Sequence, residues 1–141
     1  MAITRKRAIV FGTAAILGII AIQAFNSFAC YSQSPQTFLV VLGTFLLVPL
    51  LPALISLFTA NPLRAVGACL LFAPWLVLAY YTDCVRPYTG GGASMSYVGV
   101  LFWGTPSSII GALVTGPILR VLGIAVEKAN DSSRPTPLAS T

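Results

Sequence analysis

Charged side chains are missing from long stretches of this chain. No Asp, Glu, Lys or Arg occurs at residues 8–63, 65–82 or 87–119. These stretches contain four apolar segments, at about 8–28, 37–58, 65–81 and 96–119. Each is close to the roughly 20 residues that a helix needs to cross the hydrocarbon core of a bilayer. Because backbone groups in that core must bond within the protein, the sequence predicts an all-α polytopic membrane protein, a four-transmembrane-helix bundle.

The basic residues predict the orientation of this bundle. The chain has eight Lys and Arg residues and a formal net charge of +5. Only Arg86 lies in a loop on one side, and the other seven flank the segments on the opposite side: Arg5, Lys6, Arg7, Arg64, Arg120, Lys128 and Arg134. Since short loops rich in Lys and Arg stay in the cytoplasm, both termini are predicted to be cytoplasmic. We attribute this charge to orientation and lipid headgroups rather than to nucleic acid.

The length leaves room for four spans and short connections, so residues 1–128 are predicted to form one transmembrane domain. Residues 129–141 are rich in Ser, Thr and Pro and are predicted to be a disordered cytoplasmic tail.

The first segment also resembles a secretory signal peptide, because Ser27-Phe28-Ala29 stands before Cys30. The apolar run is long for a signal peptide, so we favour an uncleaved first helix. We expect the bacterial inner membrane as its location.

Four prolines fall near the middle of three predicted helices: Pro49, Pro52, Pro74 and Pro106. Each lacks an N–H and frees the carbonyl four residues earlier, which kinks a helix. The freed carbonyls would line a midplane cavity, as in transporters with broken helices. Alternatively, the kinks let the bundle pack, and the hydroxyls of Thr105, Ser107 and Ser108 bond to the freed backbone. We favour packing, because no charged residue lies within a predicted span.

Small residues recur every four positions in the last segment, at Gly104, Ser108, Ala112 and Gly116. This spacing makes a groove along one helix face where a second helix approaches closely. That helix belongs either to the same bundle or to another protein or a second copy of this chain. Packing within the bundle is the expected role of most such stripes, and this stripe is the strongest candidate for an external contact.

The cysteines give the most testable prediction. Cys30 and Cys84 fall at the outer ends of the first and third segments, which run in the same direction, and Cys69 lies within the third. In an oxidising compartment a disulfide between Cys30 and Cys84 is expected, with Cys69 as a free buried thiol. Nearby Gln23 and Asn26 are expected to reach water or headgroups. A catalytic pair is disfavoured, because membrane disulfide oxidoreductases use a Cys-x-x-Cys pair and this chain has none.

Missing residue types narrow the function further. The chain has no His, so no imidazole serves as a base or metal ligand. We therefore predict no catalytic, cofactor or metal site. The expected function is binding of a membrane-embedded or membrane-inserting partner protein, as a complex subunit or an immunity protein against a toxin, or self-association. Two alternatives stay open: a thiol–quinone oxidoreductase using Cys30 and Cys84, and a passive conduit for a neutral solute.

Overall fold

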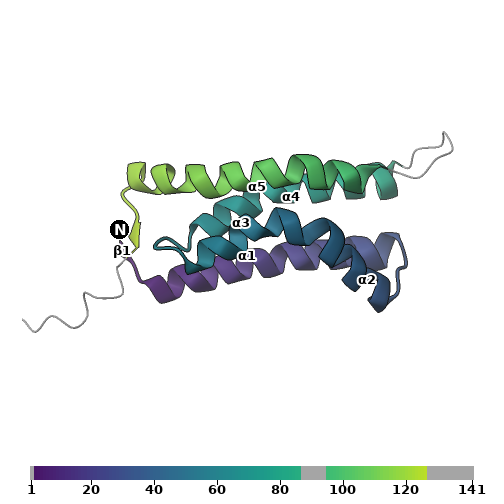
Figure 1. The fold of residues 1–141 in the computed structure, drawn as a ribbon, viewed down its shortest axis with the longest axis horizontal. Helices are drawn as coiled ribbons and strands as arrows, with labels where there is room; N and C mark the ends of the chain where they lie inside the picture. The colour runs from purple at the N-terminus through teal and green to yellow at the C-terminus, as the bar shows by residue number, and fades with distance from the viewer. Residues whose placement is uncertain (1, 87–94, 127–141) are drawn as a thin grey trace, which may run out of the picture.

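The structure is a computed structural model that describes residues 2–86 and 95–126. Figure 1 shows long helices lying side by side along one axis. In chain order the elements are β1 (Ala2–Ile3), α1 (Arg5–Phe25), η1 (Asn26–Cys30), α2 (Pro35–Val41), η2 (Leu42–Leu46), α3 (Leu47–Phe58), α4 (Arg64–Tyr80), η3 (Tyr81–Val85), α5 (Ser96–Val121) and β2 (Ala125–Val126), where η marks a π-helical turn. The predicted tail at 129–141 lies outside the described residues.

Four continuous helical segments are long and apolar enough to cross a membrane, namely Arg5–Cys30, Pro35–Phe58, Arg64–Val85 and Ser96–Val121. The prediction of four helices of spanning length is confirmed, and the observed helices extend beyond the predicted ones at most ends. The extensions arise because a helix bonds its own backbone whether or not its side chains are apolar. Charged residues such as Arg7 and Asp83 end the apolar runs, but the helices continue past them.

Local sequence signals explain where α2 begins and where α5 ends. Before α2, the Ser34 hydroxyl accepts a hydrogen bond from the backbone N–H of Thr37 over 3.2 Å, which caps the helix start. After α5, Gly123 adopts a left-handed conformation with φ of 66°. The N–H of Ile124 then reaches back to the carbonyl of Leu119 over 2.8 Å, which closes a Schellman motif. The chain therefore turns sharply away from α5.

That turn brings the two ends of the described chain together. Strands β1 and β2 pair in parallel, with Ala2 opposite Ala125 and Ile3 opposite Val126. The all-α prediction did not include this short pair. Figure 1 shows it beside the start of α1 and the end of α5, so both lie at the same end of the bundle.

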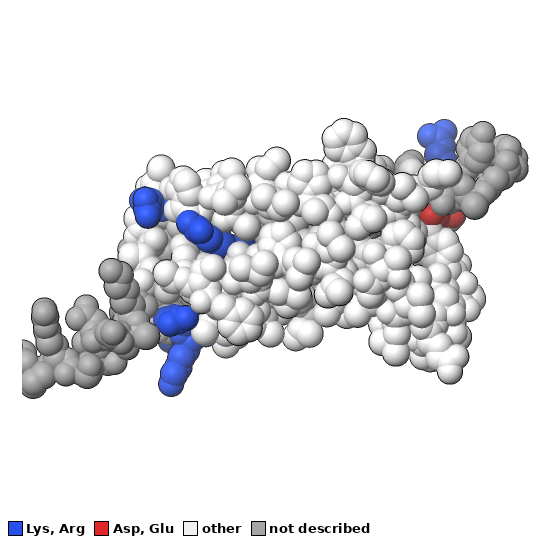
Figure 2. Space-filling model, in the orientation of Figure 1, with Lys and Arg blue, Asp and Glu red and all other residues white. Residues whose placement is uncertain are grey.

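The described cations gather mainly at that same end, which we call the basic end (Arg5, Lys6, Arg7, Arg64 and Arg120). Figure 2 shows the acidic side chain and one further cation at the opposite end. These are Asp83 and Arg86, near Cys30 and Cys84, and we call that end the disulfide end. The charge separation that the sequence predicts between the two sides of the bundle is therefore present along its long axis.

Helix α4 is the centre of the bundle, because it packs against α1, α3 and α5. Its Phe72 and Leu76 are fully buried, and several of the residues around them are alanines or glycines. Small residues let helix backbones approach one another, which is the usual packing of membrane helices. The faces that point away from α4 expose large apolar side chains such as Val10, Phe58 and Leu113. This arrangement suits a lipid environment.

The segment α2–η2 is packed differently from α3, although both belong to the same span. Figure 1 shows α2 bending away from the direction of α3 at η2. No residue of α2 is buried, whereas α3 buries Pro49, Leu50, Ala53 and Ser56. Helix α2 therefore buries no residue in the core, whereas η2 contributes the fully buried Leu46.

Candidate functional site

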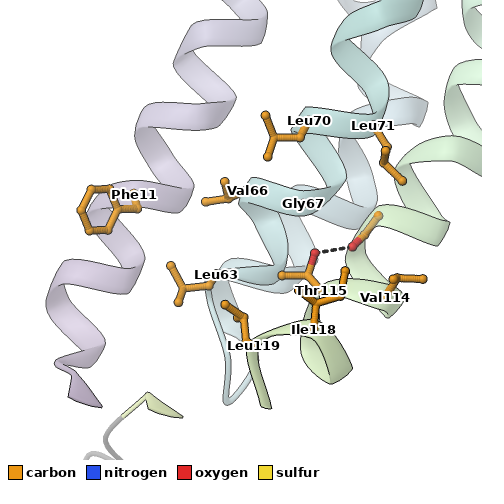
Figure 3. Close-up of a pocket in the computed structure, with 11 residues that line it drawn as sticks. Phe11, Leu63, Val66, Gly67, Leu70, Leu71, Val114, Thr115, Ile118 and Leu119 are labelled. Atoms are coloured by element: carbon orange, nitrogen blue, oxygen red, sulfur yellow. Dashed lines mark hydrogen bonds between the residues drawn. The ribbon is translucent and has the colours of Figure 1, made fainter. Parts of the chain in front are cut away.

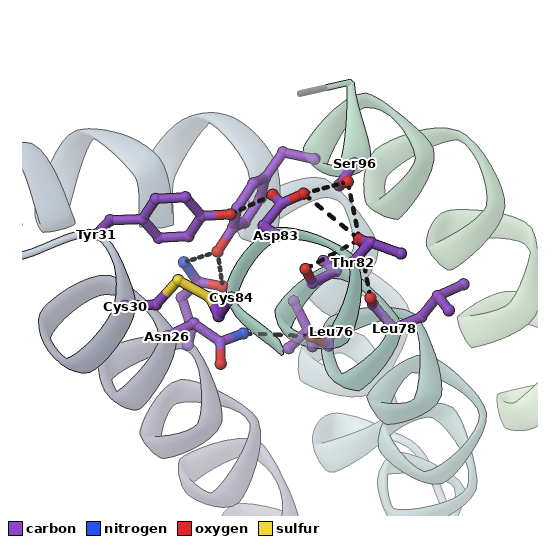
Figure 4. Close-up of a disulfide and its surroundings, with 12 residues drawn as sticks. Asn26, Cys30, Tyr31, Leu76, Leu78, Thr82, Asp83, Cys84 and Ser96 are labelled. Carbon is purple, nitrogen blue, oxygen red and sulfur yellow. Dashed lines mark hydrogen bonds between the residues drawn. A yellow bond between two sulfur atoms is a disulfide. The ribbon is translucent and has the colours of Figure 1, made fainter. Parts of the chain in front are cut away.

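The disulfide end is built around the bond between Cys30 and Cys84, whose Cα atoms are 5.8 Å apart (Figure 4). This separation is typical of disulfides. Each cysteine stands in a π-helical turn that closes a span, Cys30 in η1 and Cys84 in η3. The structure thus joins the pair that the sequence singles out, and Cys69 is free and buried as expected.

A carboxylate beside the disulfide connects three segments of the chain. Asp83 accepts a hydrogen bond from the hydroxyl of Tyr31, which follows η1. Its other oxygen accepts a bond from the Ser96 hydroxyl, at the start of α5, over 2.7 Å. Burial, and then the bond to Asp83, raise the pKa of the Tyr31 phenol above its ordinary value. Tyr31 therefore stays a neutral donor to this carboxylate.

Beneath the disulfide lies a buried polar layer. Gln23 and Asn26 expose 0% and 1% of their surface, so they do not reach water or headgroups as the sequence had led us to expect. The Gln23 amide donates to the Tyr97 hydroxyl over 3.0 Å and to the Ser27 hydroxyl over 3.1 Å. The Asn26 amide donates to the Leu76 carbonyl over 3.3 Å. Because unpaired polar groups are costly inside a protein, these bonds fix α1 against α4 and α5.

The chemistry that this end supports is a covalent staple. Cys69 lies fifteen residues before Cys84 on the same continuous helix, which is about 22 Å at the helical rise. Cys69 is therefore out of reach for exchange with the disulfide. Among the described residues no group of three His, Cys, Asp or Glu side chains could hold a metal ion.

The small-residue stripe of α5 faces inward. Gly104, Ser108, Ala112 and Gly116 are all buried. A Cβ on Gly104 would lie 2.5 Å from the Phe72 ring, and a Cβ on Gly116 would lie 2.8 Å from the Arg64 guanidinium. Side chains of α4 therefore fill the stripe at Gly104 and Gly116, whereas Ala112 lines the surface groove between α3 and α5.

Helices α4 and α5 also approach closely at two glycines that the stripe does not include. A Cβ on Gly111 would lie 2.9 Å from the Cα of Ala68, and a Cβ on Gly67 would lie 2.8 Å from the Gly111 carbonyl oxygen. Gly111 precedes Ala112 in the sequence, and a second small residue beside the stripe could have predicted this contact. Period-four spacing alone selects one row of a helix face and omits its neighbour.

The four prolines do not gather around one cavity. Pro49 is buried, whereas Pro74 and Pro106 are exposed on the outside of the bundle. Pro52 and Pro74 line separate surface grooves. The hydroxyls near Pro106 bond elsewhere, because Thr105 donates to the Leu101 carbonyl over 2.7 Å, and Ser107 accepts from the Trp75 indole over 2.9 Å. The buried Ser108 hydroxyl has no hydrogen-bond partner in the structure.

Two apolar grooves run along the bundle toward the basic end. The first has a volume of about 560 Å³ and lies between α1, α4 and α5 (Figure 3). Its one hydroxyl, on Thr115, donates to the Gly111 carbonyl of its own helix over 2.6 Å, so the walls offer no free polar group. The second groove lies between α3 and α5, has a volume of about 460 Å³, and includes Arg64.

Comparison with protein-family models, with curated proteins and with solved structures finds no match to this chain. Function is therefore inferred from the geometry of the chain itself. The disulfide end offers a rigid covalent anchor, and the helix surfaces offer unpacked apolar faces.

Proposed function

We propose that this chain is a multi-pass protein of the bacterial inner membrane, with both termini cytoplasmic, and that it binds a membrane-embedded partner protein. The four apolar helices support insertion, and the gathering of cations at the end that holds the first and last described elements supports the orientation. Partner proteins of this kind include the other subunits of a complex and a membrane-inserting toxin.

The observation that carries the partner proposal is the half-span α2–η2, in which only Leu46 is buried. It forms half of an apolar span, yet α2 buries no residue against the bundle. A helix that leaves its bundle exposes backbone and side chains on most of its circumference. We assign the partner to this surface, defined by α2 and η2.

Gly43 makes this surface suited to a helix. It lies in the π-helical turn η2, it is exposed, and a Cβ built on it would meet no atom within 4 Å. Thr44 beside it is also exposed. Exposed small residues within a span let a second helix approach the backbone and bond to a hydroxyl, which is how membrane helices associate.

Site-specific photo-crosslinking in intact membranes tests this assignment. The crosslinker is placed at Val40, which is 66% exposed on α2, and in a matched control at Val10, which is 64% exposed on α1. We expect a discrete crosslinked protein of higher mass from Val40 and none from Val10. A product of twice the chain mass identifies a second copy as the partner, and any other discrete mass identifies a different protein.

A size series on exposed glycines sharpens the test. Gly43→Leu should abolish the crosslink from Val40 without loss of folding, because the new side chain meets open space within the chain. Gly18→Leu is the control, since Gly18 on α1 is also exposed with no atom near its Cβ position. Equal crosslinking in both variants, or no discrete product from Val40, would refute the proposed surface.

The oxidoreductase and conduit alternatives have less support. The disulfide has no second thiol pair within reach, because the chain's third cysteine, Cys69, is buried about 22 Å along the helix. The prolines that would line a conduit face different directions. Neither geometry favours these functions over partner binding.

A further inference from the structure

The groove between α3 and α5 differs from the other apolar groove because it ends at a cation. Its walls are mainly apolar side chains of α3 and α5, and the hydroxyls of Ser56 and Thr105 bond to carbonyls of their own helices. Thr59 and Arg64 complete the groove toward the basic end. On α3 it extends from Val48 to Thr59, which is about 16 Å at the helical rise. One leaflet contributes about half of a hydrocarbon core of roughly 30 Å, so the groove has the length of a single leaflet.

A polar pocket adjoins this groove at the basic end. It has a volume of about 570 Å³ and shares Thr59 and Arg64 with the groove. Arg120 also lines it, together with the backbone turn that follows α5. The pocket and the groove therefore adjoin at Thr59 and Arg64, and we call the two together the recess, which is polar and cationic at the basic end and mainly apolar along α3 and α5.

One nitrogen of the Arg64 guanidinium is left unpaired. Its buried Nε has no hydrogen-bond partner among the described residues, and the same is true of the Nε of Arg5. The only carboxylate side chain among residues 2–86 and 95–126 is Asp83, which belongs to the disulfide end. Glu127 and Asp131 lie outside the described residues. A guanidinium presents five donors in a planar fork, and phosphate is a natural acceptor for that fork.

Gly116 makes room for this side chain. A Cβ at Gly116 would lie 2.8 Å from one terminal nitrogen of Arg64 and 3.1 Å from its Nε. A larger residue there would displace the guanidinium from the junction of the groove and the pocket. The cation is therefore held where the apolar and the polar parts of the recess meet.

We propose that this recess binds one anionic phospholipid from the leaflet at the basic end. Arg64 and Arg120 hold the phosphate, and one acyl chain lies along α3 and α5. The chemistry favours a lipid over a small anion, because a small anion would use the pocket and leave the apolar groove unfilled. This inference depends on the membrane insertion proposed above but not on the partner at α2–η2.

Native mass spectrometry of the full chain in detergent tests the proposal. The protein is titrated with phosphatidylglycerol and with phosphatidylcholine that carries the same acyl chains. We expect one phosphatidylglycerol molecule to bind, with an affinity about tenfold higher than that of phosphatidylcholine, from charge-assisted bonds to Arg64. Arg64→Gln should remove this preference. Arg7→Gln should keep it, because Arg7 is an exposed cation at the same end that lines neither cavity.

A second pair of variants tests the groove independently of the charge. Ile109 lines the groove and is 45% exposed, whereas the adjacent Ile110 is 53% exposed and does not line it. Ile109→Trp should weaken binding of the lipid, and Ile110→Trp should not. Both positions are on the surface, so neither variant threatens the fold.

Three results would overturn the proposal. Equal affinity for the two lipids would remove the anionic site. Equal losses in Arg64→Gln and Arg7→Gln would show diffuse attraction by surface charge. Displacement of the lipid by millimolar inorganic phosphate, with no effect of Ile109→Trp, would show a small-anion site. Co-sedimentation of the chain with membranes tests insertion separately, so failure of the lipid site and failure of the membrane assignment are distinguishable.

Discussion

The contact between α4 and α5 at Gly111 permits a sharp test of how this bundle is held together. In Gly111→Ala the new Cβ would lie nearest to the carbonyl oxygen of Gly67, and also 2.8 Å from its carbonyl carbon and 2.9 Å from the Cα of Ala68. Ordinary contact begins at 3.4 Å. All three neighbours are backbone atoms, so no side chain can rotate away. The two helices must therefore separate locally by about 0.5–1 Å, a gap that forfeits a quarter to a half of each dispersion contact.

The cost follows from the number of contacts involved. A buried side chain of leucine size makes about 40–60 contacts of roughly 0.1–0.2 kcal/mol each. Weakening the contacts of one such residue by a third costs about 2 kcal/mol. Separation of α4 from α5 also weakens the contact between Phe72 of α4 and Gly104 of α5. We therefore expect Gly111→Ala to lower the free energy of unfolding by about 2–3 kcal/mol, near the upper end for overpacking.

Unfolding by sodium dodecyl sulfate in mixed micelles, followed by circular dichroism, measures this loss. The matched control is Gly18→Ala on α1, where a Cβ meets no atom within 4 Å. There the substitution should stabilise the helix by about 0.5–1 kcal/mol, because alanine restricts the unfolded chain more than glycine. If Gly111→Ala unfolds at the same detergent fraction as Gly18→Ala, backbone contact between α4 and α5 does not stabilise this bundle.

Three further predictions concern the disulfide end and the orientation. Reduction of the disulfide between Cys30 and Cys84, which closes a loop of 54 residues, should lower the free energy of unfolding by about 4 kcal/mol in the chain-entropy model. The same unfolding assay with and without reductant measures this loss. Because the pKa of Tyr31 is raised in the folded state, the contribution of this group to stability should be complete below about pH 10 and be lost as the pH rises above it. Tyr31→Phe should lessen that alkaline fall, and an unchanged slope would exclude this group as its source. Cysteines introduced at Thr89 and Ser133 should react with impermeant thiol reagents from opposite faces of the membrane, and labelling from one face would refute the four-span topology.

The spans were predictable because each is a long run without charge, and a bilayer imposes length and apolarity on every crossing. The pairing of Cys30 with Cys84 was predictable for a related reason. Helices that start on the same side end at the same depth, so topology alone brings the two thiols to one level.

Several features escaped prediction because they depend on how each helix is rotated. The orientation of the α5 stripe toward α4 is set by which row of small residues meets Phe72 and Gly67. A sequence pattern shows which small residues share one row of a helix, but not which neighbouring helix that row faces. The burial of Gln23 was missed because its acceptor, Tyr97, is 74 residues away on another helix. The β1–β2 pair was missed because two residues are too few to carry a strand pattern.

The partner surface and the lipid recess should act independently, because they lie toward opposite ends of the same span. From Gly43 to Phe58, beside the cationic end of the recess, the chain runs 15 residues, or about 22 Å at the helical rise, whereas the apolar end of the groove at Val48 is about 8 Å from Gly43. Effects of substitutions more than roughly 7–10 Å apart without shared partners are usually additive. Arg64→Gln should therefore leave the crosslink from Val40 intact, and Gly43→Leu should leave the preference for anionic lipid unchanged. If Arg64→Gln abolished both, with unfolding in detergent unaltered, the two ends would be coupled through α3, and the recess would regulate partner binding rather than act on its own.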